Sequence, residues 1–280
     1  MPISNTGYLL IRHLVLLIFL ATLPSCPAPA TGEASFNYGT TRDSALHYYQ
    51  QGWQQIMDYG QWTAAEQSFR KAAQLDSAFL LANAVYGRIT SNVAEKKRML
   101  QLSPLEKATP DQQLLLEVYN MGNRAAVSQS ADSARQMRVD RIRRAEKNYR
   151  KFVHKYPGQS YEKAEYIEVL HALYGPERAL DSLDARVTFT QRKLPFFISY
   201  EAMMYAESDR YEEALKKIKQ LEKQASGKPW PCVPFTKASV YYEMDSLDLA
   251  LKSVNRAIEM DSAHLIAAGL KEQIEARQSK

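Results

Sequence analysis

The sequence of 280 residues has only two cysteines, Cys26 and Cys232, and its eleven glycines stand apart from one another. Two cysteines allow at most one disulfide bond. If Cys26 is modified in another way, Cys232 has no cysteine in the chain with which to pair. Isolated glycines exclude the glycine-rich turns that hold nucleotide phosphates. No Gly-x-Ser-x-Gly segment, the nucleophile motif of many hydrolases, occurs either.

Histidine is equally sparse, with five dispersed residues and no His-Glu-x-x-His pair. The sequence therefore predicts no metal site, and we expect no cofactor. The many carboxylates follow the pattern of exposed helix surfaces, so none is assigned to acid–base catalysis. We expect a protein that is not an enzyme. The alternative is a catalytic domain without a recognisable motif, which turnover by the purified protein above that of a mutant control would reveal.

No apolar run reaches the roughly 20 residues that a membrane-spanning helix requires. A shorter run at residues 14–21 follows Arg12 and His13 and precedes small and turn-forming residues. This order predicts a signal peptide over residues 1–25, with an uncleaved membrane anchor as the alternative.

The segment LPSC at residues 23–26 resembles the lipobox of bacterial lipoproteins, although Pro24 departs from the usual residue. The resemblance implies that Cys26 is acylated and becomes the new N-terminus. A competing cleavage signal, APA at residues 28–30, would instead release a soluble periplasmic or secreted protein after Ala30. Residues 26–42 are rich in Pro, Gly, Thr and Ala and lack apolar periodicity, so they predict a flexible tether.

From residue 43 onward, apolar residues recur at helical spacing and almost nothing indicates a strand. Five segments share an alanine followed four residues later by a bulky residue. The pairs are Ala65 and Phe69, Ala145 and Tyr149, Ala179 and Leu183, Ala214 and Ile218, and Ala250 and Val254. The last four alanines are 34, 35 and 36 residues apart. A period near 34 residues is typical of a repeated helical hairpin.

These residues resemble the tetratricopeptide repeat (TPR) family, whose fold is a superhelix of antiparallel helical hairpins. The match is clearest in the last unit, with Ala238, Ala250 and Ala257 as small residues against Tyr241, Leu247 and Val254. In the first unit Trp53 occupies a position where the family has a small residue. We expect small side chains to let helices approach closely while bulky ones fill the groove between them.

The resemblance implies an all-α TPR-like domain over residues 43–280, with about five to six hairpins and an irregular part between residues 80 and 130. Within that part we expect a hairpin over residues 79–102, then a helix, a polar loop at residues 122–132 and a long helix to Lys155. Residues 227–235 contain too many prolines for a helix and predict a connector. The C-terminal segment predicts a capping helix.

The family resemblance also implies a partner-binding groove on the concave side, lined by the first helix of each hairpin. The Lys and Asn residues of the family's carboxylate clamp are missing there, which leaves aromatic and Met residues edged with acid. Such a surface suits an extended or helical apolar peptide, although several of its aromatics could instead belong to the hairpin core. The expected residues are Gln50, Gln54, Met57, Asp58, Tyr161, Glu168, His171, Phe196, Met203, Glu207, Phe235, Tyr242 and Glu243.

The helix expected over residues 135–155 is strongly basic, in a chain whose formal net charge is +5. Behind an export signal, such a face suits anionic lipid head groups or an acidic protein partner better than nucleic acid. The alternative is a helix face that is simply solvated. The residues assigned to this basic face are Arg138, Arg141, Arg144, Lys147 and Lys151.

Together these features predict an exported, lipid-anchored scaffold of the bacterial cell envelope that faces the periplasm or the cell surface. It would bind a protein or peptide partner in its groove, contact the membrane through its N-terminal lipid, and bind no nucleic acid. Two alternatives are an accessory lipoprotein of outer-membrane assembly and one of nutrient uptake that captures glycans. For the latter, Trp230 is the test, since an exposed tryptophan favours stacking on sugars and a buried one favours packing.

Overall fold

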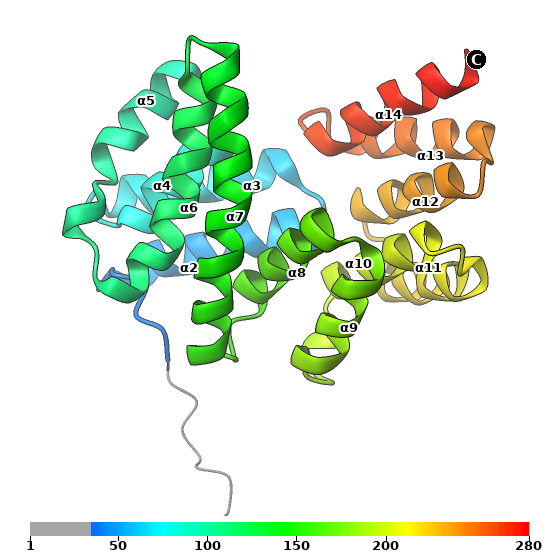
Figure 1. The fold of residues 1–280 in the computed structure, drawn as a ribbon, viewed down its shortest axis with the longest axis horizontal. Coiled ribbons are helices and arrows are strands. Elements are labelled where there is room, and N and C mark those ends of the chain that lie inside the picture. Colours follow the sequence, from blue (N-terminus) through cyan, green and yellow to red (C-terminus); the bar gives the residue numbers. More distant parts are fainter. Residues whose placement is uncertain (1–34, 280) are drawn as a thin grey trace, which may run out of the picture. The chain divides into compact units, whose positions relative to one another are not determined.

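The computed structural model describes residues 35–279. The predicted signal peptide, Cys26 and the first part of the predicted tether lie outside these residues. Within them the predicted all-α fold is confirmed, with thirteen α-helices and no strand (Figure 1). The predicted solenoid of helical hairpins is confirmed as well, because helices that follow one another in sequence pack against one another.

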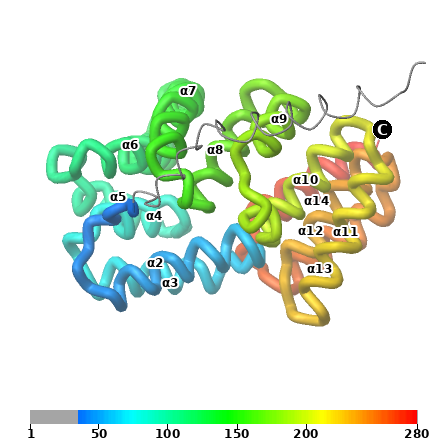
Figure 2. The backbone as a smooth tube through the Cα atoms, turned by 90° about the horizontal axis from the view of Figure 1, so that it is seen from below, coloured from blue at the N-terminus to red at the C-terminus, as the bar shows by residue number. Residues whose placement is uncertain are grey.

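Six antiparallel hairpins and one further helix make up this part of the chain (Figures 1 and 2). The first hairpin is interrupted by a π-helical turn, η1 (Gln54–Asp58), and two 3₁₀ turns, η2 (Leu105–Lys107) and η3 (Gln191–Lys193), connect later ones. The hairpins are α2 (Asp43–Trp53) with α3 (Trp62–Leu75), α4 (Leu80–Ile89) with α5 (Val93–Leu102), α6 (Pro110–Val127) with α7 (Ala131–Lys155), α8 (Ser160–Tyr174) with α9 (Pro176–Arg186), α10 (Pro195–Glu207) with α11 (Tyr211–Ala225), and α12 (Cys232–Glu243) with α13 (Leu247–Met260). Helix α14 (Leu265–Gln278) packs on α13, as expected for a capping helix.

Four of the hairpins turn through a residue with a left-handed backbone. These residues are Gly60, Gly175, Asp209 and Asp245, with φ of 70°, 82°, 57° and 57°. Glycine tolerates this conformation without cost, and aspartate tolerates it better than most residues. Each precedes by four or five positions an alanine of the repeat pattern, so the turn and the packing residue recur together.

The alanines and bulky residues of the repeat pattern are all buried. Ala65, Ala179, Ala214 and Ala250 are fully buried and Ala145 nearly so, and the five bulky residues are at most 4% exposed. The core is divided into separate clusters along the chain, as expected when each hairpin contacts mainly its neighbours.

In the first hairpin the small residue is Gly52, one position before the Trp53 that departs from the family pattern. A Cβ atom on Gly52 would lie 2.7 Å from Cε1 of Phe69 on α3. Trp53 itself is buried against Phe69 at 5.6 Å between ring centroids. Gly52 thus allows the close approach of α2 and α3, and the bulky Trp53 occupies the next position.

Two expectations about connecting segments are wrong. The polar loop predicted at residues 122–132 is helical except for residues 128–130, because α6 continues to Val127 and Ser130 caps α7 by accepting a hydrogen bond from the Ser133 amide at 3.2 Å. The connector predicted at residues 227–235 ends earlier, since α12 begins at Cys232 and takes Pro234 into its first turn. Proline is tolerated there because the first amides of a helix lack intrahelical partners.

The last part of the predicted tether packs against the helices. Phe36 is 7% exposed and packs edge-on against Phe152, with ring centroids 4.8 Å apart. The Tyr38 hydroxyl donates to Gln159 at 2.7 Å, and Thr40 donates to Asp76 at 2.6 Å. Residues 36–42 therefore belong to the folded domain, and the domain boundary predicted at residue 43 lies too late.

The turn between α2 and α3 contacts the C-terminal hairpins, far away in sequence. The Phe196 amide at the start of α10 donates to the Asp58 carboxylate at 3.2 Å, and the Cys232 amide donates to the Tyr59 carbonyl at 3.0 Å. Asp261, between α13 and α14, accepts hydrogen bonds from the amide and the hydroxyl of Thr63 at 2.9 and 2.7 Å. The C-terminal hairpins thus contact the first hairpin. A groove lies next to these contacts.

Candidate functional site: an apolar groove

A groove of about 550 Å³ is formed by residues of α2, η1, the start of α3, α4, α8, α10, α12 and the start of α14. Its lining is mainly aromatic and aliphatic, with a few polar groups. We call this cavity the groove; its residues are Trp53, Ile56, Met57, Gly60, Trp62, Arg88, Ile89, Glu168, His171, Phe196, Ser199, Tyr200, Met203, Glu207, Cys232, Phe235, His264, Leu265 and Ile266.

Helix periodicity explains how α10 supplies the longest wall. Phe196, Tyr200, Met203 and Glu207 lie three or four residues apart and so share one face of the helix. Phe196 and Tyr200 stack with ring centroids 5.2 Å apart and an interplanar angle of 15°. This stacked pair fixes the ring positions, so the wall is formed before any partner binds.

One rim of the groove carries a hydrogen-bonded row of polar groups. The Nδ1 of His171 lies 2.8 Å from the Tyr200 hydroxyl, and its Nε2 lies 2.7 Å from a carboxylate oxygen of Glu207. This order resembles a nucleophile, a base and an orienting acid. However, burial raises the pKa of Tyr200 well above its ordinary value, which is the opposite of an activated nucleophile. The hydrogen bonds of the row fix the orientation of the His171 ring between Tyr200 and Glu207.

Glu168 stands one helical turn before His171 and forms no hydrogen bond or ion pair with any other described residue. Burial raises its pKa to about 7, with the charge of Glu165 adding to the effect. Next to it, Arg88 is ion-paired with Glu165, which also accepts hydrogen bonds from Tyr119 and Tyr149 at 3.1 and 2.7 Å. The Glu168 carboxylate thus has no direct partner, although Arg88, Arg141 and His171 lie close enough to favour its ionised form.

Seven of the thirteen residues predicted for the partner-binding surface line this groove. The structure shows that they lie together, and their role in binding a partner stays a prediction. They are Met57, Glu168, His171, Phe196, Met203, Glu207 and Phe235.

The other six lie elsewhere. Gln50 and Gln54 are exposed outside the groove, and a π-helical turn begins at Gln54. Asp58 is buried behind the wall and accepts a hydrogen bond from Tyr161 at 2.9 Å. Tyr242 and Glu243, at the end of α12, lie next to α14 and α11: Arg277 lies 5.0 Å from the Tyr242 ring, and the Glu243 carbonyl accepts from Tyr211.

Several groove residues were missed by the sequence reasoning. Trp62 and His264 come together only because the α2–α3 turn contacts the C-terminal hairpin, with their rings 5.7 Å apart. Leu265 and Ile266 carried a usable signal: two adjacent aliphatic residues open the capping helix, and they are 61% and 53% exposed. Exposed aliphatic pairs next to an apolar cavity are typical of interaction sites.

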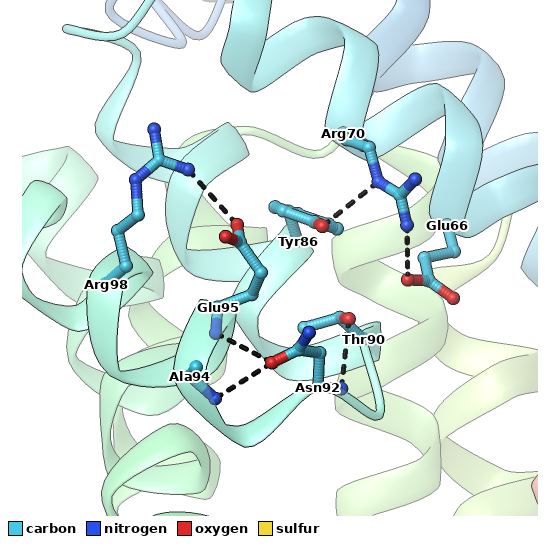
Figure 3. A network of polar contacts seen from close by, with 8 residues as sticks. All are labelled: Glu66, Arg70, Tyr86, Thr90, Asn92, Ala94, Glu95 and Arg98. Carbon is cyan, nitrogen blue, oxygen red and sulfur yellow. Dashed lines mark hydrogen bonds and ion pairs between the residues drawn. The ribbon is translucent and has the colours of Figure 1, made fainter.

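A second cavity, of about 490 Å³, lies between α3, α4 and α5. Figure 3 shows a network of polar contacts in this region. Arg70 donates to Tyr86 at 3.0 Å and is ion-paired with Glu66 at 3.0 Å. Asn92 caps α5 by accepting from the amides of Ala94 and Glu95. The charged groups of this cavity are already paired with one another, which favours a structural role over a binding one.

The predicted basic face does not form one surface. Arg138, Arg144, Lys147 and Lys151 are exposed on α7, and Arg144 is ion-paired with Glu117 at 3.4 Å. Arg141 instead is half-buried, toward α6 and α8. The set predicted as one patch is therefore divided between solvent and a pocket.

Trp230, the proposed test of sugar stacking, is 8% exposed and stacks on Tyr59 with ring centroids 4.6 Å apart. By the criterion stated above, its burial favours packing. Cys232 is also buried; burial raises the pKa of its thiol, and the Sγ donates to the Asp58 carbonyl. Both residues hold the α2–α3 turn against α12.

Among residues 35–279, no cluster of three or more His, Cys, Asp or Glu side chains is arranged to hold a metal ion. In the same range, every helix is too short or too polar to cross a bilayer. No protein-family model matches the chain, and no curated protein matches it either.

Proposed function

We propose that this protein is a binding protein whose groove holds a polypeptide segment that is apolar and carries at least one basic residue. The observation that carries the proposal is the composition of the groove: stacked aromatic and Met side chains form its walls, and Leu265 and Ile266 stand exposed at its edge. Burying these surfaces would drive binding, and Glu168 and Glu207 would select a basic residue.

The shape of the groove supports a polypeptide ligand over a small metabolite. Its walls come from at least six helices, and the polar groups sit along one rim rather than at the centre. Because the helices are held by hairpin packing, little ordering is needed on binding. We further propose that the chain is a TPR-like lipoprotein of the bacterial cell envelope, anchored through Cys26; the regular alanine spacing and the lipobox-like segment support this.

The test uses the full-length protein and peptides selected on it from a library of short random sequences. We expect the selected peptides to combine aromatic or aliphatic residues with Lys or Arg. Ile266→Lys should weaken their binding by at least about tenfold, which is about 1.4 kcal/mol. Leu249→Lys is the matched control, because Leu249 is also a solvent-accessible aliphatic residue, 51% exposed, but lies on α13 outside the groove.

The affinity of the selected peptides should also depend on pH. Burial raises the pKa of Glu168 to about 7, so this side chain is largely neutral below that pH and ionised above it. A cationic peptide prefers the ionised form, and its affinity should therefore rise between about pH 6 and about pH 8. Glu168→Gln should remove most of that rise. Equal binding by the Ile266 and Leu249 variants, or selected peptides without basic residues, would contradict the proposal.

A further inference from the structure

A small pocket between α4, α5, α6 and α7 is lined by four cationic side chains and by no acidic side chain of the described residues. Arg88, Lys96, Arg138 and Arg141 surround a volume of about 220 Å³, together with Asn123 and small residues of α6. We call it the cationic pocket. It shares Arg88 with the groove but contains none of the aromatic walls, so it is a separate feature.

Two of the four cations already have partners. Arg88 is ion-paired with Glu165, whose other oxygen accepts hydrogen bonds from two tyrosines. The Lys96 ammonium donates to the carbonyls of Gly87 and Arg88 at 2.7 and 3.3 Å, at the C-terminal end of α4. These carbonyls carry the negative end of the helix dipole, so Lys96 is partly compensated.

The other two cations, Arg138 and Arg141, have none. They lie one turn apart on α7, and neither forms an ion pair or hydrogen bond with another residue of the described chain. Arg141 is half-buried, and burial together with the charge of Arg88 lowers its pKa. Glu165 and Glu168 attract Arg141 across the neighbouring pocket that these side chains line, but neither is paired with it, so a bound anion would add a direct partner.

The geometry points to the cationic pocket as a binding site for the phosphate group of a phosphate monoester or of inorganic phosphate. Two arginines without an ion-pair partner suit the charge of about −1.5 to −2 that a phosphate monoester carries near pH 7 better than they suit the single charge of a carboxylate. Guanidinium groups also bind phosphate through two parallel hydrogen bonds.

Asn123 supplies a further polar group to the pocket. Its amide nitrogen donates to the Ala84 carbonyl at 2.9 Å, which fixes its orientation, and its Oδ1 is buried without a hydrogen-bond donor. This oxygen would accept a hydrogen bond from a hydroxyl of the ligand. The pocket therefore offers donors for phosphate and one acceptor beside them.

The experiment is a calorimetric titration of the full-length protein at constant ionic strength. The probes are inorganic phosphate, glycerol phosphate, and vesicles with and without phosphatidic acid. Saturable binding of either soluble probe identifies a free phosphorylated ligand; binding only to phosphatidic acid vesicles identifies a lipid head group. Binding to none of the probes overturns the inference.

Variants separate this site from a general effect of positive charge. Arg141→Gln should weaken binding by at least about tenfold, because it removes a charged donor to the phosphate. A lower Tm together with unchanged binding would show a merely structural role and overturn the proposal. Arg138→Gln is a second loss variant at an exposed position, and Arg143→Gln, an exposed arginine of α7 outside the pocket, is its control. Equal behaviour of the Arg138 and Arg143 variants also overturns it.

Discussion

At Gly52 the distance between two helices is set by the lack of a side chain. A Cβ atom there would meet Cε1 and Cδ1 of Phe69 at 2.7 and 2.9 Å. The Phe69 ring has little room to move, because Tyr49 and Trp53 pack against it with centroids 5.9 and 5.6 Å away. The first hairpin therefore depends on this glycine although glycine disfavours helix formation.

We predict that Gly52→Ala destabilises the protein by about 1 to 3 kcal/mol, since overpacking outweighs the gain in helix propensity of about 1 kcal/mol. Gly269→Ala is the control: this glycine also lies within a helix, but nothing would lie within 4 Å of its Cβ. That variant should be neutral or stabilised by up to about 1 kcal/mol. Urea unfolding of both variants measures the difference, and stabilisation of the Gly52 variant would refute the packing argument.

Local sequence signals were enough for the fold but only for part of the site. The alanines and their bulky partners repeat at a fixed period, so their burial could be anticipated from spacing alone. Trp62 and His264 could not be placed together, because they are about 200 residues apart and nothing in a helical period encodes that contact. Gly52 was missed since its neighbour Trp53 occupies the position where the pattern expects a small residue.

At the scale of elements, α3 begins with an unusual cap. Its own preceding residue, Gln61, provides no side-chain cap, and the carboxylate of Asp261 accepts from the Thr63 amide in the first turn instead. A carboxylate at a helix N-terminus satisfies a free amide and interacts favourably with the helix dipole. The cap of the first hairpin is thus supplied by the turn between α13 and α14.

Asp261→Ala should therefore lower the free energy of unfolding by about 1 to 2 kcal/mol. It should also lower the hydrogen-exchange protection of the amides in residues 58–63. Ser262→Ala, at the neighbouring exposed position, is expected to leave both quantities unchanged. Unaltered protection in the Asp261 variant would show that the contact between the two ends contributes little.

At the scale of the whole molecule, the proposed lipid anchor at Cys26 would place the groove at a membrane. We predict that cells label the protein with a palmitate analogue and that globomycin blocks its processing, as expected if Cys26 is acylated. Cys26→Ala should abolish the label. A wild-type protein that takes up no label would favour cleavage after Ala30 or an uncleaved leader, and the proposed anchor would then be wrong.

The hydrogen bonds from Thr63 to Asp261 have a consequence for how the chain can be shortened. Stacked helical repeats usually lose terminal units one at a time, since each unit contacts only its neighbours. A chain that stopped before α13 would leave the start of α3 uncapped and would remove Leu265 and Ile266 from the groove. Trimming this protein from its C-terminus should thus disturb its N-terminal hairpin, and an engineered minimal version would have to retain both ends.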